Sequence, residues 1–160
     1  MVLAGTCALA GACSSTTTTK SPAPSVSSDP GAAAVQQYLA AVNALCDALL
    51  PKVIAVTHGG SLDISLKEFF AQLPAHSKLR SDFDRQLALV TVPPQAKDKA
   101  AALNAYIRYA NQLDAKRLAA AKKGQVAYTA EINYELKYAA SDPSIAARTA
   151  AGFDTSCDAR

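Results

Sequence analysis

Asp114 is the one acidic residue that falls in the middle of an apolar stripe, between Ala110 and Leu118, in a segment with helical periodicity. A carboxylate in such a place must be paired, hydrated or protonated, because burying an isolated charge is costly. Counting residues from the expected turns brings Lys52 and Asn133 to the same level. The sequence therefore predicts a polar contact from Asp114 to one of them, and the alternative is a polar floor for a small pocket between helices.

Few other side chains have the types and spacing that chemistry requires. The sequence has no Glu-x-x-His pair for a di-iron centre, no CxxC or CxxCH spacing, no glycine-rich phosphate loop and no recognisable catalytic triad. Neither His58 nor His76 lies within one helical turn of a cysteine. We interpret His76 as a partly buried histidine and group it with the polar core residues around Asp114. The sequence predicts no enzyme, no metal site and no cofactor.

Two sets of side chains are candidates for contact with other molecules. Lys97, Arg108 and Lys122 share one stripe of a predicted helix, and such a stripe could touch anionic lipid head groups or cell-wall polymers. The alternative is an ordinary solvated face, which exposed bundle helices often carry. Tyr134 and Tyr138 lie one turn apart, and we expect them either to form an outward contact surface or to pack against a folded-back C-terminal helix.

The elements that position these residues are predicted to be helices. Half of the residues are apolar and only 6% are aromatic, and alanine-rich segments without β-branched runs favour an all-α fold. Start and stop signals predict four helices. The first runs from Pro30 toward Gly59, with a kink or break near Pro51, and the second runs from a capping box at Ser65 to about Thr91. The third spans about 96–123 and the fourth about 125–140. Short loops between them predict an up-down-up-down four-helix bundle. The inward residues expected on the fourth helix are Tyr128, Ile132, Leu136 and Ala139.

An apolar leader, residues 2–12, ends at Cys13 and gives way to Ser, Thr and Pro. Gly11 and Ala12 directly before Cys13, with Leu9 upstream, resemble the lipobox of a bacterial lipoprotein. The resemblance implies cleavage before Cys13 and a lipidated thiol at the outer face of the cell membrane, with plain secretion as the alternative. We expect residues 1–12 to be an N-terminally incomplete signal peptide, 13–29 a lipidated flexible tether, and 30–160 a helical bundle domain.

The lipobox interpretation assigns each of the four cysteines: one is removed with the signal peptide, one is lipidated, and two remain as a pair. With Cys7 in the leader and Cys13 lipidated, Cys46 and Cys157 remain. In an exported protein two remaining thiols most simply form a disulfide, so the sequence predicts one bridge between them.

That bridge constrains the path of the C-terminal segment. A disulfide needs Cα atoms within about 7 Å, whereas a fourth helix continuing as a rod would carry Cys157 far beyond Cys46. Asp142 and Pro143 form an N-cap and first-turn pair. We therefore expect the chain to reverse there, with a short fifth helix from Pro143 to about Phe153 folded across the end of the bundle.

The sequence resembles small exported lipoproteins of high-GC actinobacteria, including mycobacteria. The resemblance rests on four features: the lipobox-like Cys13, the Ser/Thr/Pro tether, the alanine-rich helices and the late cysteine in residues 150–157. The sequence predicts a monomeric, non-enzymatic helical module that binds an envelope protein, a cell-wall polymer or a lipid. The net charge of +3 gives no indication of a nucleic-acid partner. The alternative is a carrier of a small apolar or lipidic ligand, which a cavity of a few hundred cubic ångströms near Asp114 would favour.

Overall fold

The computed structural model describes residues 29–57, 61 and 64–159, and across these residues it contains helices and no strands. Five α-helices follow one another: α1 (Pro30–Val56), α2 (Leu66–Leu87), α3 (Lys97–Lys123), α4 (Gln125–Tyr138) and α5 (Pro143–Ala150). Short 3-10 turns occupy Pro94–Ala96, Ala139–Ser141 and Thr155–Ala159. The all-α class and a fifth helix are confirmed. Cys13, the predicted signal peptide and most of the predicted tether lie outside the described residues.

Local capping signals set the starts of three helices. The Asp29 side chain accepts a hydrogen bond from Gly31 N at 2.9 Å at the start of α1. At the start of α2, the side chain and backbone of Ser65 exchange hydrogen bonds with Glu68 in a capping box. The side chain of Asp142 accepts a hydrogen bond from Ser144 N at 2.8 Å at the start of α5. Each cap satisfies a backbone N–H that the first helical turn leaves without a partner.

The bounds of α1 and α2 decide two of the predictions. Pro51 lies inside α1, which continues to Val56, so of the predicted kink or break near Leu50 the break does not occur. Core residues on both sides of the proline hold the helix in place, since Leu49 and Val53 are buried. Helix α2 ends at Leu87, short of the expected Thr91, because the amides of Leu89 and Val90 bond to carbonyls three residues back and tighten the chain into a turn.

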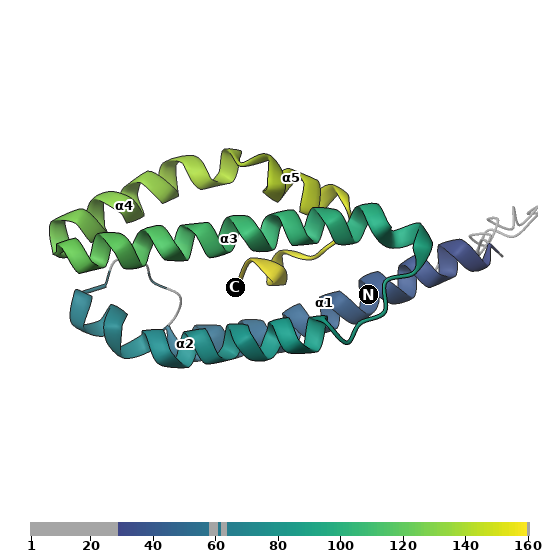
Figure 1. Ribbon diagram of the computed structural model, residues 1–160, viewed down its shortest axis with the longest axis horizontal. Helices are drawn as coiled ribbons and strands as arrows, with labels where there is room; N and C mark the ends of the chain where they lie inside the picture. Colours follow the sequence, from purple (N-terminus) through teal and green to yellow (C-terminus); the bar gives the residue numbers. More distant parts are fainter. Residues whose placement is uncertain (1–28, 58–60, 62–63, 160) are drawn as a thin grey trace, which may run out of the picture.

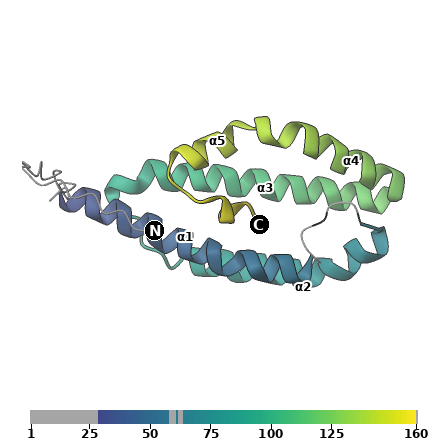
Figure 2. The ribbon, with the colours of Figure 1, turned by 180° about the vertical axis from the view of Figure 1, so that it is seen from behind.

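The helices are arranged in two layers (Figures 1 and 2). Helix α1 packs on α2, and α3 packs on both α4 and α5. The C-terminal segment after α5 passes between the layers and packs against α1. The ends of α1 and α3 and the starts of α2 and α4 lie together at one end of the molecule, on the left in Figure 1.

The chain breaks at Asp142 and Pro143 as expected, but it does not reverse there. Helix α5 continues along α3 beyond α4, and Lys99 Nζ of α3 donates a hydrogen bond to Ala151 O at 2.6 Å. The reversal comes after α5, which ends at Ala150 and not at Phe153. It lies at Gly152, whose φ of 94° is a conformation that glycine adopts without strain.

The reversed segment brings Cys157 to Cys46, and the predicted disulfide joins them with their Cα atoms 4.7 Å apart. On the way, Asp154 N donates a hydrogen bond to Asn43 Oδ1 of α1 at 3.1 Å. The bridge is fully buried. It lies in the main hydrophobic core, whose largest members include Tyr38, Leu39, Phe83, Leu103 and Phe153.

A second, smaller core lies at the end where α4 begins. Ala121, Tyr128 and Ile132 are buried there, and Ile64 and Phe69 pack against them. The two cores do not merge into one cluster. The space between them is where a cavity forms.

Among the described residues, α1 is the one helix long and apolar enough to cross a membrane. The core helix of a protein that does not cross a membrane can be equally long and apolar. Helix α1 does contribute to the main core, through Val42, Cys46, Leu49 and Val53. Its composition is also compatible with a place in the cell envelope.

Candidate functional site

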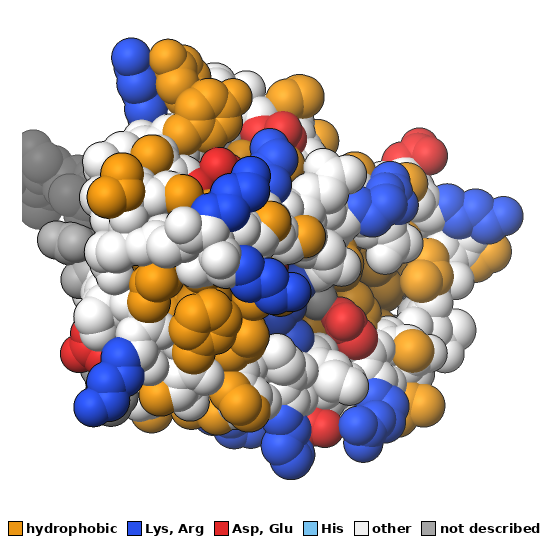
Figure 3. Space-filling view, turned by 60° about the vertical axis from the view of Figure 1, so that its left-hand side comes forward, with side chains coloured by type: hydrophobic (Ala, Val, Ile, Leu, Met, Phe, Trp, Pro, Cys, Tyr) orange, Lys and Arg blue, Asp and Glu red, His pale blue; other side chains and the backbone are white. Residues whose placement is uncertain are grey.

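A cavity of about 490 Å³, which we call the inter-layer cavity, lies between the two cores. Figure 3 turns this end of the molecule forward and shows a hollow with hydrophobic side chains inside it. Most of its wall is apolar, and the apolar side chains that line it include Leu50, Val53, Phe69, Leu73, Leu118 and Tyr128. Its volume lies within the range typical of small-molecule sites.

One wall of the cavity is polar. Gln72, His76 and Arg80 of α2 all line it, and we call these three residues the polar ridge. They are spaced four residues apart, so they lie one above another along one face of the helix. Leu50, Val53 and Ile54 of α1 form an apolar part of the lining. The cavity therefore offers a binding molecule both apolar contacts and hydrogen-bonding groups.

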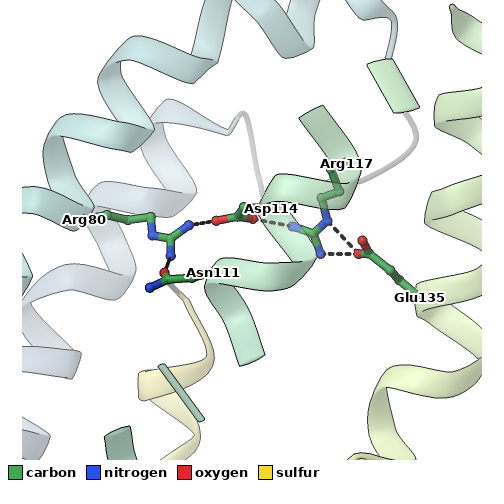
Figure 4. Close-up of polar contacts among 5 residues, drawn as sticks. All are labelled: Arg80, Asn111, Asp114, Arg117 and Glu135. Atoms are coloured by element: carbon green, nitrogen blue, oxygen red, sulfur yellow. Dashed lines mark hydrogen bonds and ion pairs between the residues drawn. The ribbon is translucent and has the colours of Figure 1, made fainter. Parts of the chain in front are cut away.

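Asp114 reaches this polar wall from α3 and pairs with two arginines, as Figure 4 shows. It forms an ion pair with Arg80 of α2, and its Oδ1 accepts a hydrogen bond from Arg117 Nη1 at 3.3 Å. The expected partners were wrong: Lys52 and Asn133 are both exposed. Asp114 lies at the predicted level between helices, but those two side chains occupy outward faces and arginines from α2 and α3 take their place.

The ion pairs extend to α4 through Arg117. Its Nε and Nη2 atoms both lie 2.6 Å from Glu135 Oε2, a two-point contact that the planar guanidinium favours. Arg80 also donates a hydrogen bond to Asn111 Oδ1. Arg80, Asp114, Arg117 and Glu135 thus form a charge network that joins α2, α3 and α4.

Glu135 is a buried residue that the sequence pattern missed. Its carboxyl is almost fully enclosed, and burial raises its pKa above the ordinary value, with Arg117 offsetting only part of that effect. Leu136, expected to point inward, is instead 66% exposed. Tyr128, Ile132 and Glu135 are the buried residues of α4, and this rotation of the helix leaves Leu136 facing solvent.

His76 lies on the polar ridge, half-buried. Burial lowers its pKa, and the positive charges of Arg80 and Arg117 lower it further. The imidazole is therefore neutral at pH 7, when it offers one hydrogen-bond donor and one acceptor.

The lowered pKa of His76 predicts a stability that falls in acid. The unfolded chain, with a histidine pKa near 6.5, takes up the proton before the folded protein does, so stability declines as pH falls below that value. Glu135, with its raised pKa, acts in the opposite sense. We therefore expect the melting temperature of the wild type to fall more steeply than that of His76→Gln as the pH falls below about 6.5. Glu135 is present in both proteins, so its opposite effect cancels in the comparison. Parallel melting curves for the two proteins would contradict this expectation.

The candidate contact residues lie on the surface. Tyr134 and Tyr138 are 53% and 45% exposed, and their ring centroids are 4.7 Å apart. Lys97, Arg108 and Lys122 on α3 are all exposed as well. None of these five residues lines the inter-layer cavity. The tyrosines and the cationic stripe are therefore separate from the cavity.

No family model, curated protein or solved structure matches this sequence. The function has to be inferred from the site, because a helical fold alone is compatible with many functions.

Proposed function

We propose that this protein is a cell-envelope lipoprotein that carries a small apolar or lipidic ligand in the inter-layer cavity. The observation that carries the proposal is the cavity itself, about 490 Å³ in volume, lined mainly by apolar side chains and bordered by Asp114. Alanine-rich helices can pack closely and leave no such space. Apolar lining with a few convergent polar groups is typical of sites for small ligands.

The proposal includes the bundle architecture. We propose that the helices form an up-down-up-down bundle that is opened at the end carrying the cavity. The packing of α1 on α2 and of α3 on α4, and the insertion of the C-terminal segment between the layers, support it. That segment fills the space around Cys46 and does not contribute to the cavity lining.

Anchoring at the membrane is a further part of the proposal. Cys13 carries the lipid, and residues 14–28 connect it to the cap of α1 at Asp29. A carrier held in this way exchanges its ligand with the membrane or with envelope components nearby. Native mass spectrometry of protein purified from its own membrane tests both features, because it reports lipidation of Cys13 and any retained ligand in one spectrum.

Partly filling the cavity is expected to weaken ligand binding without unfolding the protein. Leu73→Trp places a larger ring in the cavity wall, so the Kd for an apolar fluorescent probe should rise on the order of tenfold, which corresponds to about 1.4 kcal/mol. Leu89→Trp is the matched control, since Leu89 is 82% exposed and outside the cavity lining. Titration of both variants, with melting temperatures recorded in parallel, measures the effect. Equal affinities for the two would argue against the cavity as the binding site.

A second candidate function rests on the outer face of α4. Tyr134 and Tyr138 are exposed next to each other, and Lys137 Nζ lies 5.1 Å from the Tyr138 ring centroid. Aromatic side chains of this kind are enriched at protein interfaces. In this alternative the domain is a binding module for another envelope component. Equally poor binding of apolar molecules by Leu73→Trp and by the wild type would favour this function over the carrier function.

A further inference from the structure

The connection between α2 and α3 is unusual for a surface segment because it carries no charge. Residues 87–96 contain no acidic, basic or histidine side chain. Leu89 is 82% exposed and Val92 is 42% exposed, and Ala88 and Pro94 are exposed beside them. Single exposed apolar residues are common on protein surfaces, but a group of them within one uncharged segment is typical of a contact site. We call residues 88–94 the apolar turn.

The apolar turn is fixed to the rest of the fold. Leu87, which precedes it, and Val90 within it pack against the main hydrophobic core. The amides of Leu89 and Val90 donate hydrogen bonds to carbonyls three residues back, and Pro93 and Pro94 have no N–H to donate. The turn therefore presents its exposed side chains in a fixed arrangement. It also has few backbone donors that would lose hydrogen bonds to water in an apolar medium.

The apolar turn lies at the end of the molecule where α1 begins. Gly31 in the first turn of α1 lies beside Gln95, since a Cβ added at Gly31 would lie 3.4 Å from Gln95 Cγ. Figures 1 and 2 show the start of α1 and the α2–α3 connection at the same end of the molecule, away from the start of α4. In the proposed anchoring, Cys13 is therefore linked to the end that carries the apolar turn.

The length of that link decides which end of the molecule lies nearest the membrane. A coil of sixteen residues spans about 20 to 24 Å on average, whereas α1, with 27 residues, is about 40 Å long. The link thus holds the apolar turn closer to the membrane than the far end of the bundle. Two apolar side chains bind a bilayer weakly by themselves, but the link gives them a high effective concentration at its surface.

We propose that the apolar turn inserts Leu89 and Val92 into the interfacial region of the lipid membrane to which Cys13 is anchored. This inference rests on the anchoring in the proposed function and does not depend on the carrier function. It directs the end that bears the inter-layer cavity away from the bilayer. A carrier held in this orientation exchanges its ligand with envelope components and not directly with the bilayer.

The test uses tryptophan fluorescence, because the chain has no tryptophan of its own. Leu89→Trp places one reporter on the turn, and Val126→Trp is the matched control, since Val126 is 87% exposed at the start of α4. Full-chain protein purified from its own membrane is reconstituted in vesicles of phosphatidylcholine and phosphatidylglycerol, with or without bromine on the acyl chains. We expect the emission of Leu89→Trp to shift to shorter wavelength and to lose most of its intensity in the brominated vesicles. The emission of Val126→Trp should change in neither respect.

A second pair of variants tests whether Val92 enters the membrane together with Leu89. Adding Val92→Asp to Leu89→Trp places a charge on the turn, so most of the quenched fluorescence should return. Adding Val126→Asp instead places the same charge at the far end, and the quenching should stay as it is. Circular dichroism of both double variants verifies that they remain folded, and the two single variants test the inference even if one of them does not.

Mass spectrometry of the same samples separates this inference from the proposed function. An unmodified Cys13 would overturn the proposed anchoring and the inference with it. When Cys13 is lipidated, three results would overturn the inference alone: no quenching of Leu89→Trp, equal quenching of both reporters, or quenching that a folded Val92→Asp variant leaves unchanged. A Leu89→Trp emission that is shifted but not quenched would mean that a protein surface, and not lipid, covers the turn.

Discussion

Removing the disulfide is expected to lower the free energy of unfolding by about 4 to 5 kcal/mol, according to the chain-entropy estimate for a loop of this size. Cys46 and Cys157 are 111 residues apart, so the bridge encloses almost the whole helical domain. Its main effect is to restrict the unfolded chain. The double variant Cys46→Ala/Cys157→Ala should therefore melt at a much lower temperature while retaining most of its helical circular dichroism below the transition.

Reduction provides the matched control for this prediction. A thiol reductant should lower the melting temperature of the wild type toward that of the double variant and leave the double variant unchanged. Two further results would contradict the prediction: a double variant as stable as the wild type, or alkylation of both cysteines in exported protein that has never been reduced.

The helix starts could be predicted because their signals are local. Asp29 with Pro30, Ser65 with Glu68, and Asp142 with Pro143 each satisfy the first turn from within a few residues. Such caps depend little on the rest of the fold. The disulfide followed from counting cysteines, given the interpretation of Cys13.

The path of the C-terminal segment could not be predicted in the same way. The break at Pro143 is local, but the direction of α5 depends on its packing along α3, which no short motif encodes. Gly152 gave no distinctive signal among the seven glycines of the chain. Its positive φ, and the neighbouring Leu39, whose Cδ1 would lie 3.2 Å from an added Cβ, are properties of the folded chain that the sequence does not display.

The candidate site shows the same division between local and long-range information. Asp114 could be singled out because an acid in an apolar stripe is anomalous. Its partners could not, since Arg80 comes from another helix and Arg117 belongs to a run of basic residues that is typical of a solvated face. The burial of Glu135 could not be predicted either, because hydrophobic periodicity assigns its neighbour Leu136, and not the acid, to the core.

Arg148 is the clearest case of a residue whose role only the structure reveals. It lies in the last turn of α5 and is 1% exposed. Its Nη1 atom donates hydrogen bonds to the carbonyl oxygens of Phe153 and Asp154, in the segment that reverses the chain. Its guanidinium lies 4.9 Å from the centroid of the Tyr106 ring on α3. Arg148 therefore joins α5, α3 and the reversed segment.

Replacing Arg148 with alanine is expected to cost about 3 to 5 kcal/mol of stability, since it removes two hydrogen bonds to backbone carbonyls, a cation–π contact and the volume of a buried side chain. Arg148→Lys should fall between the alanine variant and the wild type, because lysine keeps the charge but lacks the planar fork and the stacking surface. Arg108→Ala is the matched control: Arg108 is exposed on α3, and its loss should change stability by no more than about 0.5 kcal/mol.

Hydrogen exchange distinguishes this role from general destabilisation. If Arg148 holds the reversed segment in place, the amides of Phe153 and Cys157 should lose protection in Arg148→Ala by more than the amides of α2, which packs on α1. The disulfide still tethers Cys157 in this variant, so the change reports docking of the segment and not its escape. A uniform loss of protection, or equal melting temperatures for Arg148→Ala and Arg108→Ala, would mean that the segment is held by the disulfide and the hydrophobic core alone.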